Sequence, residues 1–312
     1  MEKSQKKATA RTLLTVIALG MGFAIPHASF GATYTLPHNG NIVGNIQYGT
    51  VLPGDTLSSM GLRYGVGGYE MLEANPGVSF RDPPEGRSLL IPSRFILPEA
   101  SRKGIVINIA ELRLYYYHPD GVTVSTYPIG VGKTGWDTPL GKTTITRMRE
   151  KPTWIVPDSI IENHLRHGKV IPKVKPPGPD NPLGDYALNI GFKSIVIHGT
   201  PYPKRVGLRA SHGCINMTNE DVGELFRMVK VGTPVEIVHQ PTKIGQLDNK
   251  IYLESHVPIS SDQLSANNED VGGMIQKVTS KLGSKNFSVQ WQAVDELQRS
   301  HQGYPQPIGS IF

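Results

Sequence analysis

The sequence predicts a mainly β central domain, a small α+β module before it and a helical segment after it. Between residues 102 and 240, short runs rich in Ile, Val, Tyr and Thr alternate with turn residues, as is typical of strands. Residues 44–93 favour the order strand, helix, helix, strand, and the chain after residue 258 is polar with two weakly amphipathic stretches. With 312 residues, 38% of them hydrophobic, the chain is long enough for one sizeable core and a second module.

The N-terminus has the three regions of a secretory leader. Basic residues are followed by an apolar stretch over residues 13–25 and by small residues that end at Gly31. A membrane-spanning helix needs about 20 apolar residues, and this stretch is shorter. We therefore expect residues 1–31 to be a signal peptide cleaved after Gly31, with export and no membrane span afterwards; the alternative is a membrane anchor.

Charge argues against a nucleic-acid partner. The chain has 32 basic and 26 acidic residues, a net charge of +6, and its basic side chains are spread along the sequence. The predicted leader holds four basic residues and one acidic residue, which leaves +3 for the rest. Nucleic-acid-binding domains usually carry a concentrated basic patch. We therefore expect no nucleic-acid partner.

The N-terminal module is expected to contain a strand over residues 45–52, a turn, a helix capped by Thr56 or Ser58, a second helix that ends before Pro76, and a closing strand over residues 86–92. Proline stops the second helix because it cannot continue the hydrogen-bond pattern. This order predicts a compact unit of about fifty residues.

The central domain is expected to form an antiparallel or mixed sheet. Residues 142–149 alternate as an exposed strand does, and the other predicted strands cover residues 105–109, 112–117, 122–131, 187–190, 194–197 and 234–238. Thr218 is expected to cap a helix in a pattern that resembles a capping box, and residues 222–229 carry its apolar face.

Residues 152–182 are rich in Pro and Gly, and the run 175–184 is expected to hold little regular structure. Long irregular segments in compact domains are usually functional lids or disordered loops. The apolar run Trp154-Ile155-Val156 favours an ordered lid, because these side chains need a surface to pack on. An exposed surface loop is the alternative.

The C-terminal segment, residues 248–312, is expected to be a helical appendage. Residues 261–282 and 289–299 have weak helical periodicity, and the tail from residue 303 is rich in Pro and Gly. We infer no chemistry from this segment.

Cys214 is the only cysteine of the chain, so it forms no internal disulfide. A single thiol in an oxidising compartment is a chemical liability, which favours a working nucleophile over a buried apolar filler. Cys214 lies in a Ser-His-Gly-Cys turn shortly before the predicted helix, where backbone N–H groups favour the thiolate.

His198 ends a predicted strand sixteen residues before the cysteine. A neighbouring imidazole can take the thiol proton and return it to a leaving amine, while the N–H groups of Gly213 and Cys214 can face a tetrahedral oxyanion. No local Asp or Asn is available to orient His198, so we assign that task to a backbone carbonyl, that of Gly199. His212 would hold the loop or donate a hydrogen bond.

A zinc site is the alternative for His198, His212 and Cys214. No further cysteine and no HExxH spacing accompanies them, so we expect no metal and no cofactor.

These motifs resemble the L,D-transpeptidase (YkuD-type) catalytic domain. The resemblance extends from about residue 103 to residue 239 and rests on His198-Gly199-Thr200, Ser211-His212-Gly213-Cys214-Ile215-Asn216-Met217, Thr138-Pro139-Leu140-Gly141, Pro152-Thr153-Trp154 and the Pro-rich run 176–184. Together with the leader and the first module, the layout is similar to the Gram-negative periplasmic subgroup.

The resemblance implies a β-sandwich with a short helix after the nucleophile, Cys214 as nucleophile, His198 as base and the Ser-His-Gly-Cys turn as oxyanion hole. Many family members carry Arg two residues after the nucleophile, where this chain has Asn216. An amide cannot neutralise a substrate carboxylate, so Arg209 or Arg205 would supply the charge. The expected site is catalytic Cys214, His198, His212, Gly213 and Gly199, with Ser211, Asn216 and Arg209 binding substrate.

The first module resembles the lysin-motif (LysM) peptidoglycan-binding domain in Pro53-Gly54-Asp55-Thr56-Leu57, Arg63-Tyr64-Gly65-Val66, Asn75-Pro76 and Leu90-Ile91-Pro92. A structural cap is the alternative. The predicted organisation is a signal peptide (1–31), a LysM-like domain (44–93), a catalytic domain (102–240) and an appendage (248–312).

The function that the resemblance implies is transpeptidation of peptidoglycan stem peptides. Cys214 would form a thioester with the L-centre of diaminopimelate, release D-Ala and pass the acyl group to an outer-membrane lipoprotein lysine or to a second diaminopimelate. Hydrolysis or amino-acid exchange at the same site is one alternative. A non-catalytic peptidoglycan-binding protein is another.

Overall fold

A nine-stranded mixed sheet is the centre of the computed structural model, which describes residues 31–258 and 271–312. Two pairs of neighbouring strands are parallel, β6 with β17 and β14 with β16. All other neighbouring strands of this sheet are antiparallel. In spatial order the strands are β1 (Ala32–Thr35), β8 (Thr123–Pro128), β7 (Arg113–Tyr117), β6 (Gly104–Asn108), β17 (Pro234–Val238), β10 (Gly141–Glu150), β13 (Tyr186–Ile190), β14 (Val196–His198) and β16 (Ile215–Asn216). The predicted mainly β fold is confirmed.

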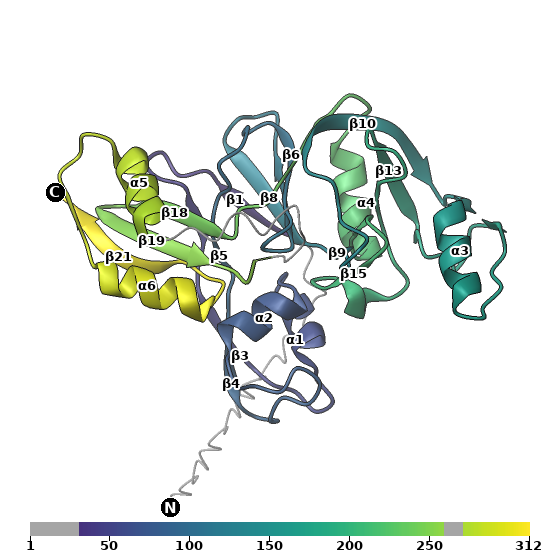
Figure 1. The fold of residues 1–312 in the computed structure, drawn as a ribbon, viewed down its shortest axis with the longest axis horizontal. Coiled ribbons are helices and arrows are strands. Elements are labelled where there is room, and N and C mark those ends of the chain that lie inside the picture. Colours follow the sequence, from purple (N-terminus) through teal and green to yellow (C-terminus); the bar gives the residue numbers. More distant parts are fainter. Residues whose placement is uncertain (1–30, 259–270) are drawn as a thin grey trace, which may run out of the picture.

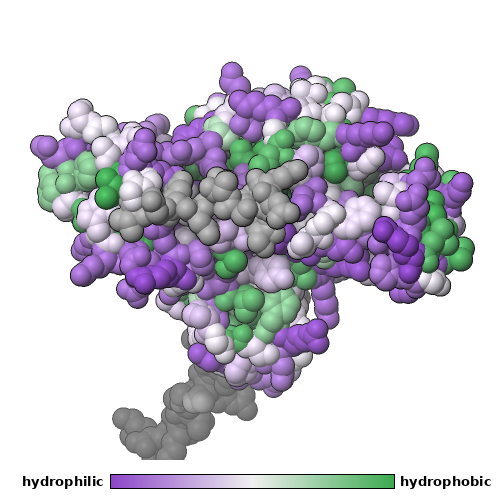
Figure 2. Space-filling view, in the orientation of Figure 1, coloured by the Kyte–Doolittle hydropathy of each residue, from purple (hydrophilic) through white to green (hydrophobic). Residues whose placement is uncertain are grey.

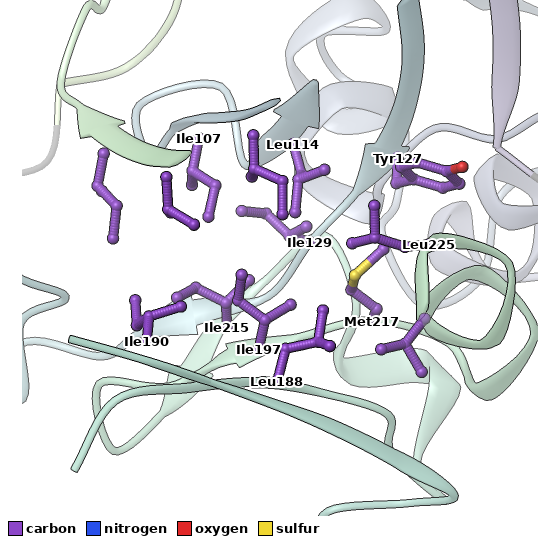
Figure 3. Packing of buried hydrophobic residues seen from close by; sticks show 14 of the residues in the cluster. Ile107, Leu114, Tyr127, Ile129, Leu188, Ile190, Ile197, Ile215, Met217 and Leu225 are labelled. Carbon is purple, nitrogen blue, oxygen red and sulfur yellow. The ribbon is translucent and has the colours of Figure 1, made fainter. Parts of the chain in front are cut away.

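The main core lies between two halves of this sheet. In Figure 3, side chains of β6 and β7 face those of β13, β14 and β16, with Ile107 and Leu114 on one side and Leu188 and Ile197 on the other. The long strand β10 joins the halves, because its first residues pair with β17 and its last with β13. Its outer face is exposed, as the alternation predicted.

Helix α4 (Asn219–Met228) covers one edge of this core, and its residues Val222 and Leu225 are fully buried. Thr218 caps it by accepting the Asp221 N–H at 3.1 Å. The second half of a capping box is not formed, since the Asp221 carboxylate accepts the Gly31 N–H at 3.0 Å instead. Gly31 is the one residue of the predicted leader that the structure describes; residues 1–30 lie outside it.

The N-terminal module has the predicted strand-helix-helix-strand order. It consists of β3 (Gln47–Thr50), α1 (Leu57–Arg63), α2 (Gly68–Ala74) and β4 (Ser88–Ile91), and β2 (Ile42–Gly44) pairs with β5 (Arg94–Ile96) beside it. Of the two candidate caps, Thr56 is the one used: it accepts the Ser59 N–H and forms a capping box with it.

This module packs against the central sheet. One buried cluster joins its Leu57, Met60 and Ile91 to Val106 and Tyr115 on the sheet. Between the two parts, Arg113 forms a buried ion pair with Glu70 and the Tyr69 N–H donates to Gly207 O at 3.1 Å. The module is therefore attached through a shared core and through the loop that precedes Cys214 (Figure 1).

The C-terminal segment contains the two expected helices and, together with the preceding residues 242–247, forms a sheet that was not predicted. Helices α5 (Val271–Leu282) and α6 (Trp291–Ser300) accompany strands β18 (Thr242–Leu247), β19 (Lys250–Ser255), β21 (Gln306–Ile311) and β20 (Phe287–Val289). The start of the first predicted helix, residues 261–270, lies outside the described residues. The tail forms β21, where pairing with two neighbours outweighs the low strand propensity of Pro and Gly.

The Pro-rich segment holds more regular structure than expected. Strands β11 (Trp154–Ile155) and β12 (Val174–Lys175) pair, and helix α3 (Asp158–Arg166) lies between them and projects from one end of the molecule (Figure 1). The apolar run was expected to be buried, yet Ile155 is 74% exposed and only Val156, at 4%, is enclosed. Figure 2 shows apolar residues on the surface at this end.

Within the part of the chain that the structure describes, no helix is both long and apolar enough to cross a membrane.

Candidate active site

Two adjacent parallel strands bring the predicted nucleophile and base together. His198 is the last residue of β14 and lies opposite Asn216 of β16, and Cys214 directly precedes β16. Both side chains line one groove of about 760 Å³ between the sheet and the α3 segment. The pairing of β14 with β16 therefore places two groups that are sixteen residues apart in sequence at one edge of the sheet.

His198 is held as a neutral imidazole. It is buried, and its Nδ1 donates to Gly199 O at 2.6 Å, which leaves Nε2 as an acceptor. This is the carbonyl that the sequence analysis chose. Burial lowers the His198 pKa to about 4; the Gly199 hydrogen bond opposes this shift and the charge of Arg149 adds to it. Nε2 is therefore ready to take a proton at neutral pH.

Cys214 is a thiol in this state. Burial raises its pKa, a backbone hydrogen bond from Val196 opposes the rise, and the sulfur lies 3.5 Å from Ser194 O, to which it can donate. The prediction that N–H groups near the helix start favour the thiolate is wrong. Helix α4 begins only at Asn219, behind its own Thr218 cap, and burial dominates instead. The pair is thus a thiol and a neutral imidazole rather than an ion pair.

Hydrogen bonds hold the turn around Cys214 from both sides. Ser211 Oγ accepts the Gly213 N–H at 3.1 Å and donates to Cys214 O at 2.6 Å. Thr138 Oγ1 donates to Gly213 O at 2.9 Å. Gly213 has φ of +98°, a conformation that favours glycine. Its N–H is engaged within the turn, so its role in an oxyanion hole stays a prediction.

His212 lies near helix α3. Its ring is perpendicular to that of Trp136, with 4.5 Å between the ring centroids, and its centroid lies 6.5 Å from that of His164 in α3. Burial and the charge of Lys133 lower its pKa, and its Nε2 is enclosed without a hydrogen-bond partner. His212 therefore lies between the Ser211–Cys214 turn and α3.

The two loop arginines that were considered for a substrate carboxylate lie in different places. Arg205, in the 3₁₀ turn Pro203–Arg205, lines the groove with its guanidinium over the Tyr202 ring. Arg209, the first residue of β15 (Arg209–Ser211), lines a separate cavity. Asn216 lines the groove and is 6% exposed, and its Oδ1 lacks a hydrogen-bond partner. Of these arginines, only Arg205 lies in the groove with Cys214.

The groove is basic. Among its described lining residues are Arg147, Arg149 and Arg205 and three imidazoles, and none of them is a carboxylate. The two arginines of β10 were not among the predicted site residues. Their spacing of two residues, which puts both on one face of a strand, was the available signal.

One group of potential metal ligands occurs in the described residues, away from the groove. Ligand atoms of Glu111, Glu254 and His256 lie within 4.8 Å of one another, and all three residues are buried. Lys243 Nζ is 2.6 Å from Glu111 and 2.7 Å from Glu254. The Lys243 ammonium occupies the position that a metal ion would take, so we interpret this cluster as an ion-pair network.

A mixed sheet with a thiol and an imidazole in one groove is the arrangement of a cysteine-dependent enzyme, and comparison with known proteins identifies the family. Residues 102–237 match the L,D-transpeptidase catalytic domain family. The chain is 43% identical over 242 residues to the probable L,D-transpeptidase ErfK/SrfK of Escherichia coli K12, which covers 76% of this chain and 78% of that protein. It is 37% identical over 300 residues to the probable L,D-transpeptidase YbiS of the same strain, and this match covers 95% of this chain and 97% of that protein.

The chain belongs to the L,D-transpeptidase family and is an enzyme that acts on peptidoglycan. Among solved structures it is similar to the catalytic domain of the E. faecium L,D-transpeptidase, with 24% identity, a TM-score of 0.35, and coverage of 45% of this chain and 100% of that one.

Proposed function

We propose that Cys214 is the acyl-accepting nucleophile of this transpeptidase and that His198 is its base. The observation that carries this proposal is the common position of the thiol and of the unprotonated His198 Nε2 in one groove, at the ends of adjacent strands. A neutral thiol beside a neutral imidazole suits transfer of the proton during attack, because neither group must first be charged.

The reaction follows from these two groups. Cys214 Sγ attacks the carbonyl of the L-centre of diaminopimelate in a tetrapeptide stem, and its proton passes to His198 Nε2. The tetrahedral intermediate collapses, His198 returns the proton to the leaving amine, and D-Ala departs. An acceptor amine attacks the thioester, gives its proton to His198 and releases Cys214 as a thiol. The thioester conserves the bond energy, so the transfer needs no ATP.

The charge of the groove supports an anionic donor. Three arginines and no carboxylate line its described part, and stem peptides carry several carboxylates. Arg205 then supplies the charge that Asn216 cannot, while Asn216 Oδ1, which lacks a partner, is free to accept a peptide N–H. Ser211 and Gly213 hold the nucleophile turn.

The acceptor is the finer part of the proposal. We propose an amine of a second diaminopimelate or the C-terminal lysine of an outer-membrane lipoprotein. Hydrolysis and exchange with a free amino acid are the alternatives at the same site. The periplasm is the proposed location, and residues 44–93 are proposed as a LysM-like peptidoglycan-binding domain, residues 102–240 as the catalytic domain and residues 248–312 as an appendage.

Mass spectrometry of the products separates these possibilities. The enzyme is incubated with tetrapeptide muropeptide alone, and again with a peptide that ends in the lipoprotein lysine. We expect D-Ala release and a cross-linked product with the preferred amine. Cys214→Ala should abolish both, whereas release of D-Ala by that variant would refute the thioester route. Release of D-Ala by neither protein would contradict the proposed donor reaction.

A further inference from the structure

Arg149 is the groove cation whose charge acts on the proposed base. It comes from β10 and lines the groove together with His198 and Cys214. Its positive charge is one of the causes that lower the His198 pKa. The interaction between charges weakens with distance, so the guanidinium lies in the part of the groove that holds the imidazole. The proton transfers between Cys214 and His198 do not use this charge.

Two hydrogen bonds hold the Arg149 guanidinium at the groove. Its Nε donates to Asn189 Oδ1 and its Nη1 donates to Thr153 O, each at 3.1 Å. Asn189 of β13 lines the groove as well, and Thr153 directly precedes β11 at the start of the α3 segment. A guanidinium has five N–H donors, so three remain. Nη2 has no partner among the described residues and is not enclosed, so the side chain is positioned with donors left for a ligand.

The charge of Arg149 is not compensated by the protein. Among the described residues, no ion pair includes Arg149 or Arg147, which lies two residues earlier on β10. Burial and the charge of Arg147 lower the pKa of Arg149, yet a guanidinium stays charged in proteins. No carboxylate lines the described part of the groove. Two neighbouring cations without a counterion favour an anionic ligand group, and a carboxylate matches the guanidinium fork.

The geometry of the leaving group determines which carboxylate of the donor comes closest. In D-Ala the nitrogen and the carboxylate share one carbon, so each carboxylate oxygen lies within about 4 Å of the nitrogen. His198 Nε2 must come within about 3 Å of that nitrogen to return the proton. The D-Ala carboxylate therefore lies within about 7 Å of Nε2. Every other carboxylate of the stem is separated from the scissile bond by more covalent bonds.

We propose that Arg149 binds the terminal carboxylate of D-Ala in the donor stem and thereby selects donors that end in a free carboxylate. This role rests on the proposed reaction, in which D-Ala leaves and His198 protonates its nitrogen. Arg147 adds positive charge on the same face of β10. Arg205 comes from a different segment of the groove and remains available to another carboxylate of the stem.

The same contact strengthens the base. The charge of Arg149 lowers the His198 pKa, and a carboxylate bound to Arg149 offsets that charge. The imidazole then holds the thiol proton more firmly while Cys214 attacks. The base is therefore strongest when a donor with its terminal carboxylate occupies the groove.

Two donors that differ in one charge test this role. The purified enzyme is given a tetrapeptide stem that ends in D-Ala, or the same stem ending in D-alaninamide, which has nearly the same shape and no terminal charge. We expect kcat/KM for release of the last residue, measured by mass spectrometry, to be about ten-fold or more higher for the acid. Equal values would overturn the role of Arg149 and leave the thioester reaction intact. Release from neither donor would contradict the thioester reaction itself, and the role of Arg149 with it.

Variants then locate the contact. Arg149→Gln should lower kcat/KM for the acid about ten-fold or more and leave the value for the amide within about two-fold, so that the preference disappears. Lys142→Gln removes a positive charge from an exposed position of the same strand and should keep the preference. An unchanged preference in folded Arg149→Gln, or an equal fall for acid and amide, would refute the assignment.

Alkylation of Cys214 by iodoacetamide at pH 8 is the control for the nucleophile. This neutral reagent needs the thiol and its base and no carboxylate, so its rate should be the same in the unaltered enzyme, Arg149→Gln and Lys142→Gln. Slower alkylation in Arg149→Gln would mean that Arg149 supports the structure of the site, which would count against a specific contact with the donor. The comparison of acid and amide in the unaltered enzyme needs no variant and decides the matter if Arg149→Gln does not fold.

Discussion

The pH dependence of Cys214 acylation tests the neutral pair most directly. With a His198 pKa of about 4, roughly nine-tenths of the imidazole is unprotonated at pH 5, whereas a histidine with the ordinary pKa of 6.5 would be only about 3% unprotonated. A base that needs free Nε2 is therefore about thirty-fold more available at pH 5 than an unperturbed one. We expect the acylation rate to stay nearly constant between pH 8 and pH 5 and to fall near pH 4.

The assay measures the rate of carbapenem addition to Cys214 by intact mass at each pH. Half-maximal acylation near pH 6.5 would refute the reasoning, because it would mean that burial does not hold His198 neutral. Arg149→Gln is the matched variant. Arg149 is one cause of the low His198 pKa, so removing its charge should move the acid limb to higher pH.

Folding must be followed across the same pH range. The unfolded chain takes up the His198 proton first, because the pKa is about 6.5 unfolded and about 4 folded. The stability linked to this group is therefore fully present above pH 6.5 and is lost as the pH falls towards 4, to an extent of about 3 kcal/mol. Circular dichroism at each pH separates loss of the base from loss of the fold.

Two further predictions concern how the parts are held together. Lys243→Met leaves the buried Glu111 carboxylate without its cation and removes one of the two cations beside Glu254, so the free energy of unfolding in urea should fall by about 3–5 kcal/mol. Lys142→Met, at an exposed pair, should change it by less than about 1 kcal/mol. Gly207→Ala would put a Cβ 2.3 Å from Gly67 Cα and should separate the N-terminal module from the loop before the nucleophile, measured as faster proteolysis and slower acylation. Gly121→Ala has a similar φ in open space and should leave both rates unchanged; equal effects of the two variants would mean that backbone strain alone is responsible.

Local patterns predicted much of the fold. The strands of the central sheet, the Thr56 and Thr218 caps and the apolar face of α4 follow from residue spacing, because capping and amphipathic periodicity act over a few residues. The hydrogen bond from His198 to Gly199 O is also local, since it joins neighbouring residues. Such features need no knowledge of the rest of the chain.

The C-terminal sheet and α3 could not be predicted in the same way. Strands β18 and β19 carry Lys243 and Glu254, which look like surface residues in sequence. Both are buried, and Lys243 forms ion pairs with Glu254 and with Glu111 of the central sheet region. Charged residues at core positions hide the alternation that identifies a strand. Strand β21 contains Pro and Gly, and it forms because two neighbouring strands supply its hydrogen bonds.

The sequence by itself determined which groups could do the chemistry: one cysteine, a histidine at a strand end and a glycine turn between them. Only the tertiary structure decided their protonation states and which side chains surround them. Burial keeps Cys214 a thiol and His198 neutral. The fold also brings Arg149 of β10 close enough for its charge to lower the pKa of His198. It also separates Arg205 from Arg209, four residues apart, into two different cavities. Charge state and exposure depend on segments distant in sequence, and spacing along the chain does not contain them.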